Sequence, residues 1–262
     1  YEQITVICLR KGEYRLPQNV CVYVLPRNRF GRTWQILQLS STLLYDAVFV
    51  HMNPEYLVAA GWLWRLLGKK TALWYTHKAV NLRLRIAALF ADVIFTASEE
   101  SFRLRSHKVR IVGHGIDTDF FSPDLAIARG HAALSAGRLT RSKRHDLAIE
   151  RAAAAGVELR IAGEGPERAH LEALAKRLGA RVDFLGPLTQ VQLRDEYRRA
   201  AYLVHTSETG SLDKVVLEAL ACGCPVRTDD QALKFLEHEG RAYVVEHHSL
   251  RTLIKHLVEK VQ

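Results

Sequence analysis

The strongest constraint on the fold is a regular alternation of short apolar runs with helix-length segments along nearly the whole chain. The later runs are almost continuously apolar, which is typical of strands covered on both faces in a parallel sheet. This alternation predicts βαβ units, in which each helix crosses from one parallel strand to the next. The expected strands lie at 4–9, 20–25, 47–51, 72–76, 93–96, 109–112, 132–136, 158–162, 182–185 and 202–205. The expected helices lie at 33–44, 54–67, 81–90, 145–154, 167–178, 190–200, 212–222 and 250–260.

One segment interrupts this rhythm and divides the chain. The stretch GHGIDTDFFSPD at 113–124 is rich in Gly, Asp and Pro, has no hydrophobic period and predicts a linker. We therefore expect an α/β protein of two Rossmann-like, doubly wound domains, at 1–121 and 122–262. Ligands of such sheets bind beyond the carboxyl ends of the strands, so the cleft between the domains is the expected site.

Composition and charge limit the function classes. Apolar residues make up 48% of the 262 residues and charged residues 25%, as in an ordinary globular protein. The excess of 37 Lys+Arg over 28 Asp+Glu gives a net charge of +9, which suits nucleic acid, a phosphate-bearing small molecule or an anionic membrane surface. No nucleic-acid recognition motif is present, so nucleic acid is not an expected partner.

The four cysteines do not form a disulfide framework or a metal site. Cys8 and Cys21 lie in strand-like runs and are expected as buried thiols. Cys222 and Cys224 form a C-x-C pair without a second pair of ligands, so no metal is expected. Reduced cysteines indicate the cytoplasm. The long apolar stretch at 56–67 is interrupted by Arg65 and is too short to span a bilayer.

The sequence IAGEGPE at 161–167 is the strongest local motif. An apolar strand runs into Gly163, Glu164 and Gly165, and Pro166 then opens a helix. Glycines let a backbone approach a ligand closely, and the amides of a helix N-terminus favour an anion. An ordinary strand-to-helix turn would give the same pattern.

A basic turn follows the first strand after the linker. The sequence SAGRLTRSKR at 135–144 places Gly137, Arg138 and Lys143 at the carboxyl end of a strand. Arg and Lys there would bind a diphosphate. A solvated basic loop is the alternative.

A third segment, TSETGSLDKVVLEALACGCPV at 206–226, leads from a strand into a helix. Gly210 and Ser211 lie near the expected helix start, and Ser211 is a candidate N-cap. Glu218 sits among apolar neighbours on that helix. There a carboxylate needs ligand hydroxyls or a cation, unless it faces solvent.

Together these motifs resemble the GT-B glycosyltransferases of family 4, the glycosyl transferases group 1, in a bacterial branch. GHGIDTDFFSP, SAGRLTRSK, IAGEGPE and TGSLDKVVLEALACGCPV match in order and spacing. The resemblance implies two Rossmann-like domains facing a cleft and a retaining sugar transfer from a nucleotide sugar.

The resemblance also implies roles for individual residues. Arg138 and Lys143 match the pair that binds the donor diphosphate, and Glu218 matches the glutamate that holds the ribose. His77 in LWYTHK resembles the histidine near the transferred sugar, with His51 a weaker candidate for the same cleft. The remaining donor-binding positions are Gly137, Gly163, Glu164, Gly165, Gly210, Ser211 and Leu212.

Three departures from the family pattern affect these expectations. Gly210 stands where the family has the first of two paired glutamates, and Glu208 lies two residues away. The family's first strand with its glycine-rich loop is absent, and the segment after Pro225 is shortened. A chain without an initiator Met and without this strand is expected to be a truncated or processed form.

We therefore expect a retaining glycosyltransferase that moves a hexose from a nucleoside-diphosphate sugar to a glycan or lipid-linked acceptor. Neither a cofactor nor a metal is expected, because protein cations and helix amides stabilise the leaving diphosphate. The alternatives are a degenerate nucleotide-binding module and a nucleotide-sugar epimerase on the same fold. Basic and aromatic residues of the first domain predict docking at an anionic membrane surface, which would place the protein in the cytoplasm at the inner face of the plasma membrane. Burial of the aromatic residues in the core is the alternative.

Overall fold

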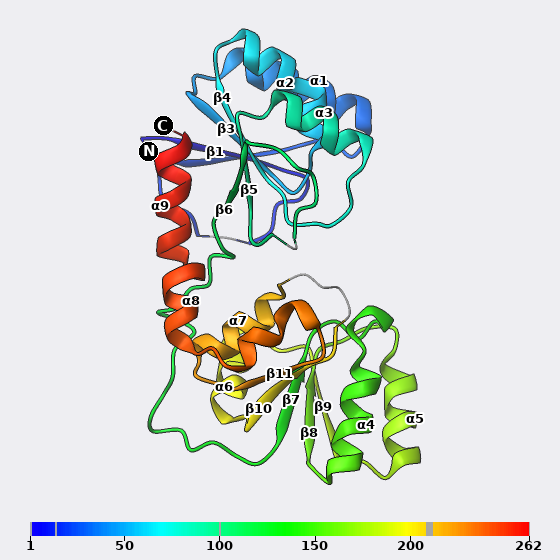
Figure 1. Cartoon of the computed structure of the whole chain (residues 1–262). Coiled ribbons are helices and arrows are strands. Elements are labelled where there is room, and N and C mark those ends of the chain that lie inside the picture. The colour runs from blue at the N-terminus through cyan, green and yellow to red at the C-terminus, as the bar shows by residue number, and fades with distance from the viewer. Residues whose placement is uncertain (1, 14, 100, 208–211, 262) are drawn as a thin grey trace.

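The structure is a computed structural model that describes residues 2–13, 15–99, 101–207 and 212–261. In these residues the strands form two larger parallel sheets and a separate two-stranded pair, and the larger sheets lie in different lobes (Figure 1). The expectation of parallel α/β domains is confirmed.

The first lobe contains a four-stranded sheet in the order β3-β4-β5-β6, counted over the described residues. Two helices of this lobe begin at side-chain caps: Asn28 accepts a hydrogen bond from the Gly31 amide, and Asn81 accepts one from the Leu84 amide. The elements are α1 (Arg29–Thr42), β3 (Ala47–His51), α2 (Glu55–Leu66), β4 (Lys70–Trp74), α3 (Leu82–Phe90), β5 (Val93–Thr96) and β6 (Val109–Ile111).

The first two strands, β1 (Ile4–Cys8) and β2 (Val20–Val24), pair with each other and with no other strand that the structure describes. Both strands are largely exposed. The expectation of buried thiols is therefore wrong for Cys21, which is exposed, and for Cys8, which is half-buried. These thiols lack the covering layers that the larger sheets have.

The second lobe contains a sheet in the order β11-β10-β7-β8-β9. The chain runs outward from β7 through β8 to β9, and then returns to the other side of β7 with β10 and β11. The elements are β7 (Ala133–Ala136), a 3-10 turn η1 (Arg141–Lys143), α4 (His145–Ala155), β8 (Leu159–Ala162), α5 (Arg168–Leu178), β9 (Val182–Gly186), α6 (Gln190–Arg199), β10 (Tyr202–His205), α7 (Lys214–Ala221) and β11 (Val226–Thr228).

Beyond Pro225 the structure contains elements that the sequence did not predict. Besides β11 these are the 3-10 segment η2 (Gln231–Glu237) and α8 (Arg241–His248). Arg241 holds this segment in place by donating to the backbone carbonyls of Thr118, Phe121 and Ala221.

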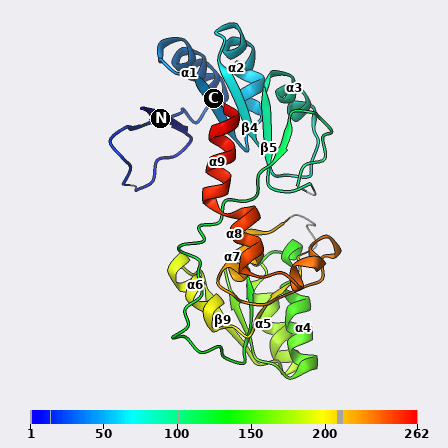
Figure 2. The same ribbon diagram turned by 60° about the vertical axis from the view of Figure 1, so that its left-hand side comes forward.

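The C-terminal helix α9 (Leu250–Val261) crosses from the second lobe back to the first (Figures 1 and 2). Its Leu253 and Leu257 pack against a cluster of buried residues that includes Trp74 of β4 and Phe95 of β5. The predicted division at residue 121 assigns this helix to the second domain, whereas its apolar face packs on the first sheet. The linker at 113–124 and helix α9 therefore both join the lobes. Ile116 of the linker forms a β-bridge with Ser249, the residue before α9.

No helix in the described part of the chain is both long and apolar enough to cross a membrane.

Candidate functional site

The strand order of the second sheet defines a topological switch point between β7 and β10. These strands are neighbours, with Tyr202 paired to Ala133, and the chain leaves them in opposite directions across the sheet. Loops that diverge from adjacent parallel strands leave a crevice at the carboxyl ends, where ligands of doubly wound sheets bind. The predicted basic turn follows β7, and the 206–213 segment follows β10.

The glycine-rich turns after β7 and β8 pack directly against each other. Gly163 has a φ of +142°, and a Cβ atom on it would lie 1.9 Å from the carbonyl oxygen of Gly137. A Cβ atom on Gly165 would lie 2.3 Å from the carbonyl oxygen of Leu139, whose amide donates to the Glu164 carbonyl. The close approach that Gly163 and Gly165 allow is thus to another backbone segment.

The side chain of Glu164 points to its own helix. Its Oε1 accepts a hydrogen bond from Arg168 at 2.9 Å, one helical turn away. The pair is partly exposed, and such surface pairs contribute about 0–1 kcal/mol.

The two predicted cations differ in their environment. Arg138 is exposed, and its side chain has no hydrogen-bond or ion-pair partner among the described residues. Lys143 Nζ lies 2.5 Å from Asp213 Oδ2, and both side chains are largely buried. This ion pair joins the turn after β7 to the N-cap of α7.

Asp213 and His205 belong to this arrangement, although sequence reasoning missed both. His205 Nε2 lies 3.0 Å from the same carboxylate oxygen of Asp213, and His205 Nδ1 lies 3.0 Å from Thr228 Oγ1. Burial raises the pKa of Asp213, but hydrogen bonds from His205 and Lys143 and the Lys143 charge outweigh it, so the pKa is lowered. Asp213 is thus ionised at neutral pH.

A buried histidine lies beside the same turn. His145 Nδ1 pairs with Ser135 Oγ at 2.9 Å, whereas Nε2 has no well-aligned hydrogen-bond partner among the described residues. A Cβ atom on Gly137 would lie 3.9 Å from this Nε2 and 3.9 Å from Lys143 Cδ. Burial lowers the pKa of His145 to about 4, although a hydrogen bond to the Arg138 backbone opposes this effect.

Glu218 lies on α7 and is half-buried, with a partner that the sequence did not predict. Its Oε2 accepts a hydrogen bond from Tyr197 Oη of α6 at 3.1 Å. Burial raises the pKa of Glu218 above its usual range, while the Tyr197 bond and the charge of Lys214 oppose this shift.

The remaining predictions near α7 have mixed outcomes. Gly210, Ser211 and Glu208 lie outside the described residues. Leu212 is 5% exposed and packs in the main hydrophobic cluster of the second lobe.

The histidines of the first lobe follow its sheet strands. His77 is exposed beyond β4, and its Nδ1 accepts a hydrogen bond from the Ala79 amide at 3.0 Å. In the neutral ring Nε2 therefore carries the proton. His51 ends β3 and stacks on Trp74. Burial and then the charge of Lys214 lower its pKa, so this residue is within electrostatic range of the second lobe.

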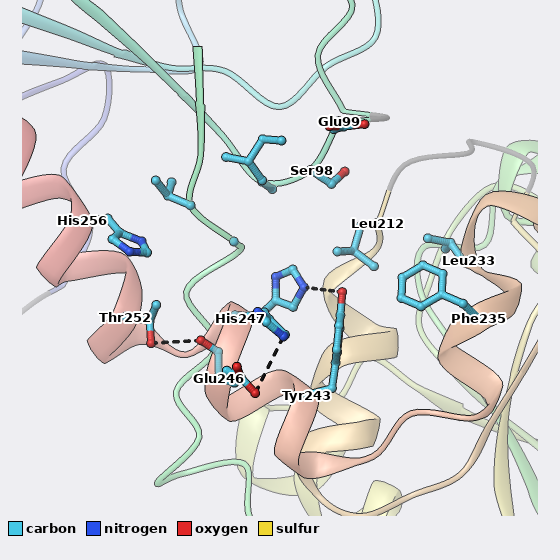
Figure 3. A pocket seen from close by; sticks show the side chains of 15 residues that line it. Ser98, Glu99, Leu212, Leu233, Phe235, Tyr243, Glu246, His247, Thr252 and His256 are labelled. Atoms are coloured by element: carbon cyan, nitrogen blue, oxygen red, sulfur yellow. Dashed lines mark hydrogen bonds and ion pairs between the residues drawn. The ribbon is translucent and has the colours of Figure 1, made fainter. Parts of the chain in front are cut away.

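A hollow of about 400 Å³ lies between the lobes (Figure 3). Ser98 and Glu99 line it from the first lobe, and Phe235, Tyr243 and His247 line it from the second. A smaller hollow of about 270 Å³ lies beyond β10 and β11, where it is lined by Ser207, Asp229 and Asp230, and Asp229 forms an ion pair with Arg151. Leu212 lines the larger hollow, but Arg138, Lys143, Glu218 and His77 line neither.

Comparisons with solved structures confirm the GT-B fold. The chain superimposes on the Anabaena protein HepE in complex with UDP with a TM-score of 0.74 at 16% identity, covering 93% of this chain and 86% of that one. A glycosyltransferase from Rickettsia africae gives a TM-score of 0.72 at 11% identity, covering 92% and 84%.

Sequence comparisons find relatives of part of the chain. D-inositol 3-phosphate glycosyltransferase from Mycobacteroides abscessus is 37% identical in an alignment of 137 residues that covers 45% of this chain and 31% of the relative. The enzyme of the same name from Kribbella flavida is 37% identical in an alignment of 148 residues that covers 45% of this chain and 34% of the relative. The match thus spans about a third of these relatives. The family model for glycosyl transferases group 1 matches residues 130–261, half of the chain. The chain therefore belongs to the glycosyl transferases group 1 family.

Proposed function

We propose that this protein is a retaining, metal-independent glycosyltransferase that moves a hexose from a nucleoside-diphosphate sugar to a glycan or lipid-linked acceptor. The observation that carries the proposal is the switch point between β7 and β10, where Arg138 and Lys143 follow one strand and the N-terminus of α7 follows the other. Cations and helix amides at such a crevice favour a diphosphate.

The comparisons support the donor class. HepE has been solved with UDP and, in a second structure, with UDP and glucose. The named relatives are glycosyltransferases, and the family model matches residues 130–261, which include the second sheet.

Arg138, Glu218 and His77 would have different roles in the transfer. Departure of a nucleoside diphosphate develops negative charge, and fixed cations such as Arg138 stabilise it in the transition state. Glu218 would exchange its Tyr197 partner for ribose hydroxyls. His77 would present its Nε2 proton to an oxygen of the transferred sugar.

Nucleotide binding provides the test of the site. Calorimetry with UDP, GDP and ADP should find one nucleotide that binds, and Arg138→Met should weaken its binding by about 1–3 kcal/mol, the value of a hydrogen bond to a charged group. Arg141→Met is the matched control, since Arg141 lies in the same turn as Arg138, is 92% exposed, and pairs with Glu167 of the turn after β8. Equal affinity in both variants would contradict the assignment of Arg138. Donor hydrolysis that survives EDTA would support metal independence.

A degenerate nucleotide-binding module is the second candidate, and two contacts favour it. Lys143 is already paired with Asp213, and Glu218 with Tyr197, so two expected ligand-binding groups have protein partners. Nucleotide binding without turnover of any nucleotide sugar would support this candidate.

We also propose that the helical layer of the first lobe docks on an anionic membrane at the cytoplasmic face of the plasma membrane. Helices α1, α2 and α3 adjoin one another on one side of the sheet (Figure 1). Their exposed apolar side chains include Phe30, Trp34, Leu66, Leu82 and Leu89. Arg29, Arg83 and Arg85 lie on the same helices. Apolar anchors among basic residues are typical of peripheral binding.

Vesicle co-sedimentation tests this surface. Binding should require anionic lipid, fall with salt, and fall several-fold in Trp34→Ser, because Trp34 is 71% exposed on α1. Leu178→Ser, at an exposed apolar site in the second lobe, is the control. Binding that ignores both lipid charge and salt would contradict the proposal.

A further inference from the structure

The larger hollow between the lobes is a cavity that the proposed donor contacts do not use. Its volume of about 400 Å³ lies within the range of about 300–1,000 Å³ that is usual for small-molecule sites. Both lobes contribute walls: Ser98 and Glu99 follow β5, whereas Phe235 belongs to η2 and Tyr243 to α8 (Figure 3). A molecule held here would therefore contact both lobes at once.

The wall from the second lobe is aromatic and apolar. The rings of Phe235 and Tyr243 meet edge to face, with centroids 5.8 Å apart and an interplanar angle of 75°. Phe235 is 47% exposed, and Leu212 and Leu233 also line the hollow. Aromatic rings that stay accessible in a hollow offer flat apolar surfaces to a ligand. Such surfaces suit the C–H face of a sugar ring.

The polar part of the lining includes two carboxylates, one from each lobe. The side chain of Glu99 is exposed and forms no hydrogen bond or ion pair with any residue that the structure describes. Glu246 is also exposed, and its Oε2 lies 3.8 Å from Nε2 of the neighbouring His247. A carboxylate accepts hydrogen bonds and donates none, so it is matched by the hydroxyl groups of a ligand.

The charge of the hollow disfavours an anionic ligand. The described residues that line it include these two carboxylates but no Lys or Arg, although the whole chain has a net charge of +9. Burial lowers the pKa of His248 to about 4, so this lining ring is neutral at pH 7. A phosphate in the hollow would lose its hydration beside two carboxylates, with no lysine or arginine to pair with. The hollow therefore favours an uncharged molecule that carries hydroxyl groups.

The hollow adjoins the proposed donor crevice. Leu212 lines the hollow, and the next residue, Asp213, is the N-cap of α7 and pairs with Lys143 of the turn after β7. One end of the hollow thus lies close to the strand ends where the diphosphate is proposed to bind. A ligand of the hollow would lie beside the donor.

We propose that this hollow holds the acceptor, and that the part of the acceptor it holds is an uncharged saccharide packed on Phe235 and Tyr243. The hydroxyl groups of this saccharide donate to Glu99 and Glu246. The inference rests on the proposed function and deepens it by naming the acceptor class and the residues that select it. In the transfer, an acceptor hydroxyl oxygen bonds to the anomeric carbon of the donor sugar, the bond from this carbon to the diphosphate breaks, and the hydroxyl proton leaves with the diphosphate.

Saturation-transfer NMR titrations of the full chain, in the presence of the nucleotide that it binds, test this assignment. The probes are methyl glucoside, methyl galactoside, methyl mannoside and N-acetylglucosamine, each compared with its 6-phosphate. At least one neutral probe should bind. Its 6-phosphate should bind about fivefold more weakly or worse, because the added charge meets Glu99 and Glu246.

Variants of the aromatic wall test the position of the site. Phe235→Ala should weaken binding of the neutral probe about tenfold and leave the nucleotide affinity unchanged, because Phe235 lines the hollow and not the switch point. Phe235→Trp keeps a flat ring and should retain most of the binding. Trp62→Ala is the matched control, since Trp62 is also 47% exposed but lies on α2 outside the hollow.

A charge reversal at Glu99 tests the selection against anions. Glu99→Lys should bring the affinity for the 6-phosphate up to that for the neutral probe or above it. Because Glu99 is exposed and unpaired among the described residues, the substitution breaks no contact of the fold. Thermal unfolding of each variant reports whether it is folded, and Glu99→Lys decides the question if Phe235→Ala does not fold.

The outcomes distinguish this inference from the proposed function. Suppose that nucleotide binds but no neutral probe does, or that the 6-phosphates bind more tightly: the inference alone is then overturned. It is overturned in the same way if Phe235→Ala and Trp62→Ala bind the neutral probe equally well. Should the unaltered protein bind none of UDP, GDP and ADP, the proposed function fails, and the assignment of an acceptor fails with it.

Discussion

Lowering the pH from 7 to 5 is expected to remove about 2 kcal/mol of unfolding free energy for each of three histidines whose pKa is lowered by burial. His114, His145 and His248 each have a pKa lowered from 6.5 to about 4, in every case chiefly by burial. The folded protein keeps these rings neutral, whereas the unfolded chain protonates them near pH 6.5. Between these pH values the unfolded state binds more protons, so stability falls as the pH falls.

The combined loss is large for a protein of this kind. Single domains commonly have a free energy of unfolding of about 5–15 kcal/mol. Lowering the pKa of one histidine from 6.5 to about 4 corresponds to about 3 kcal/mol of that free energy. His114 and His248 also contact each other where the two segments between the lobes cross. We therefore expect acid to disrupt the joint between the lobes and to unfold the chain before pH 4.

Urea unfolding at pH 7 and at pH 5 measures this effect. The difference in the free energy of unfolding between pH 7 and pH 5 should be about 2 kcal/mol smaller in His145→Gln, because this variant lacks one titrating group. His131→Gln is the control, since His131 is exposed and should leave the difference unchanged. The assignment would be contradicted if both variants showed the same pH dependence as the unaltered protein.

Much of the fold follows from local sequence patterns. The runs at 47–51, 93–96 and 202–205 coincide with β3, β5 and β10, because each is a short, mainly apolar run between helix-length segments. The strand β11 has three residues and η2 has no helical period, so neither has a pattern long enough to recognise. The apolar face of α9 was visible in the sequence, but nothing local indicates that it packs on the first sheet.

The site was predictable only where its residues follow strands directly. Arg138 and Gly163 were placed correctly at strand ends, because parallel strands bring their carboxyl ends to one edge of the sheet. The ion pair of Lys143 with Asp213 joins residues 70 positions apart, and no local pattern records such a contact. The bond between Glu218 and Tyr197 likewise depends on the packing of α6 against α7.

Replacing Gly163 by alanine is expected to destabilise the second lobe by more than about 3 kcal/mol. The new Cβ atom would lie 1.9 Å from the Gly137 carbonyl oxygen and 2.9 Å from the carbonyl carbon. Both contacts are to backbone, so no side-chain rotation relieves them, and the φ of +142° is itself a conformation that alanine adopts with strain.

The matched control is Gly156→Ala. Gly156 also has a positive φ, +65°, but a Cβ atom there would meet nothing within 4 Å. Gly156→Ala is expected to lower the free energy of unfolding by about 1 kcal/mol, from backbone strain alone. Urea unfolding of both variants thus separates the clash from the strain. Equal stabilities would show that the turns after β7 and β8 do not pack closely, and Gly163 would then be left for a ligand to approach. If Gly163→Ala is much less stable than Gly156→Ala, Gly163 is required for the packing of the two turns. Contact with the donor would then depend on Arg138 and the N-terminus of α7.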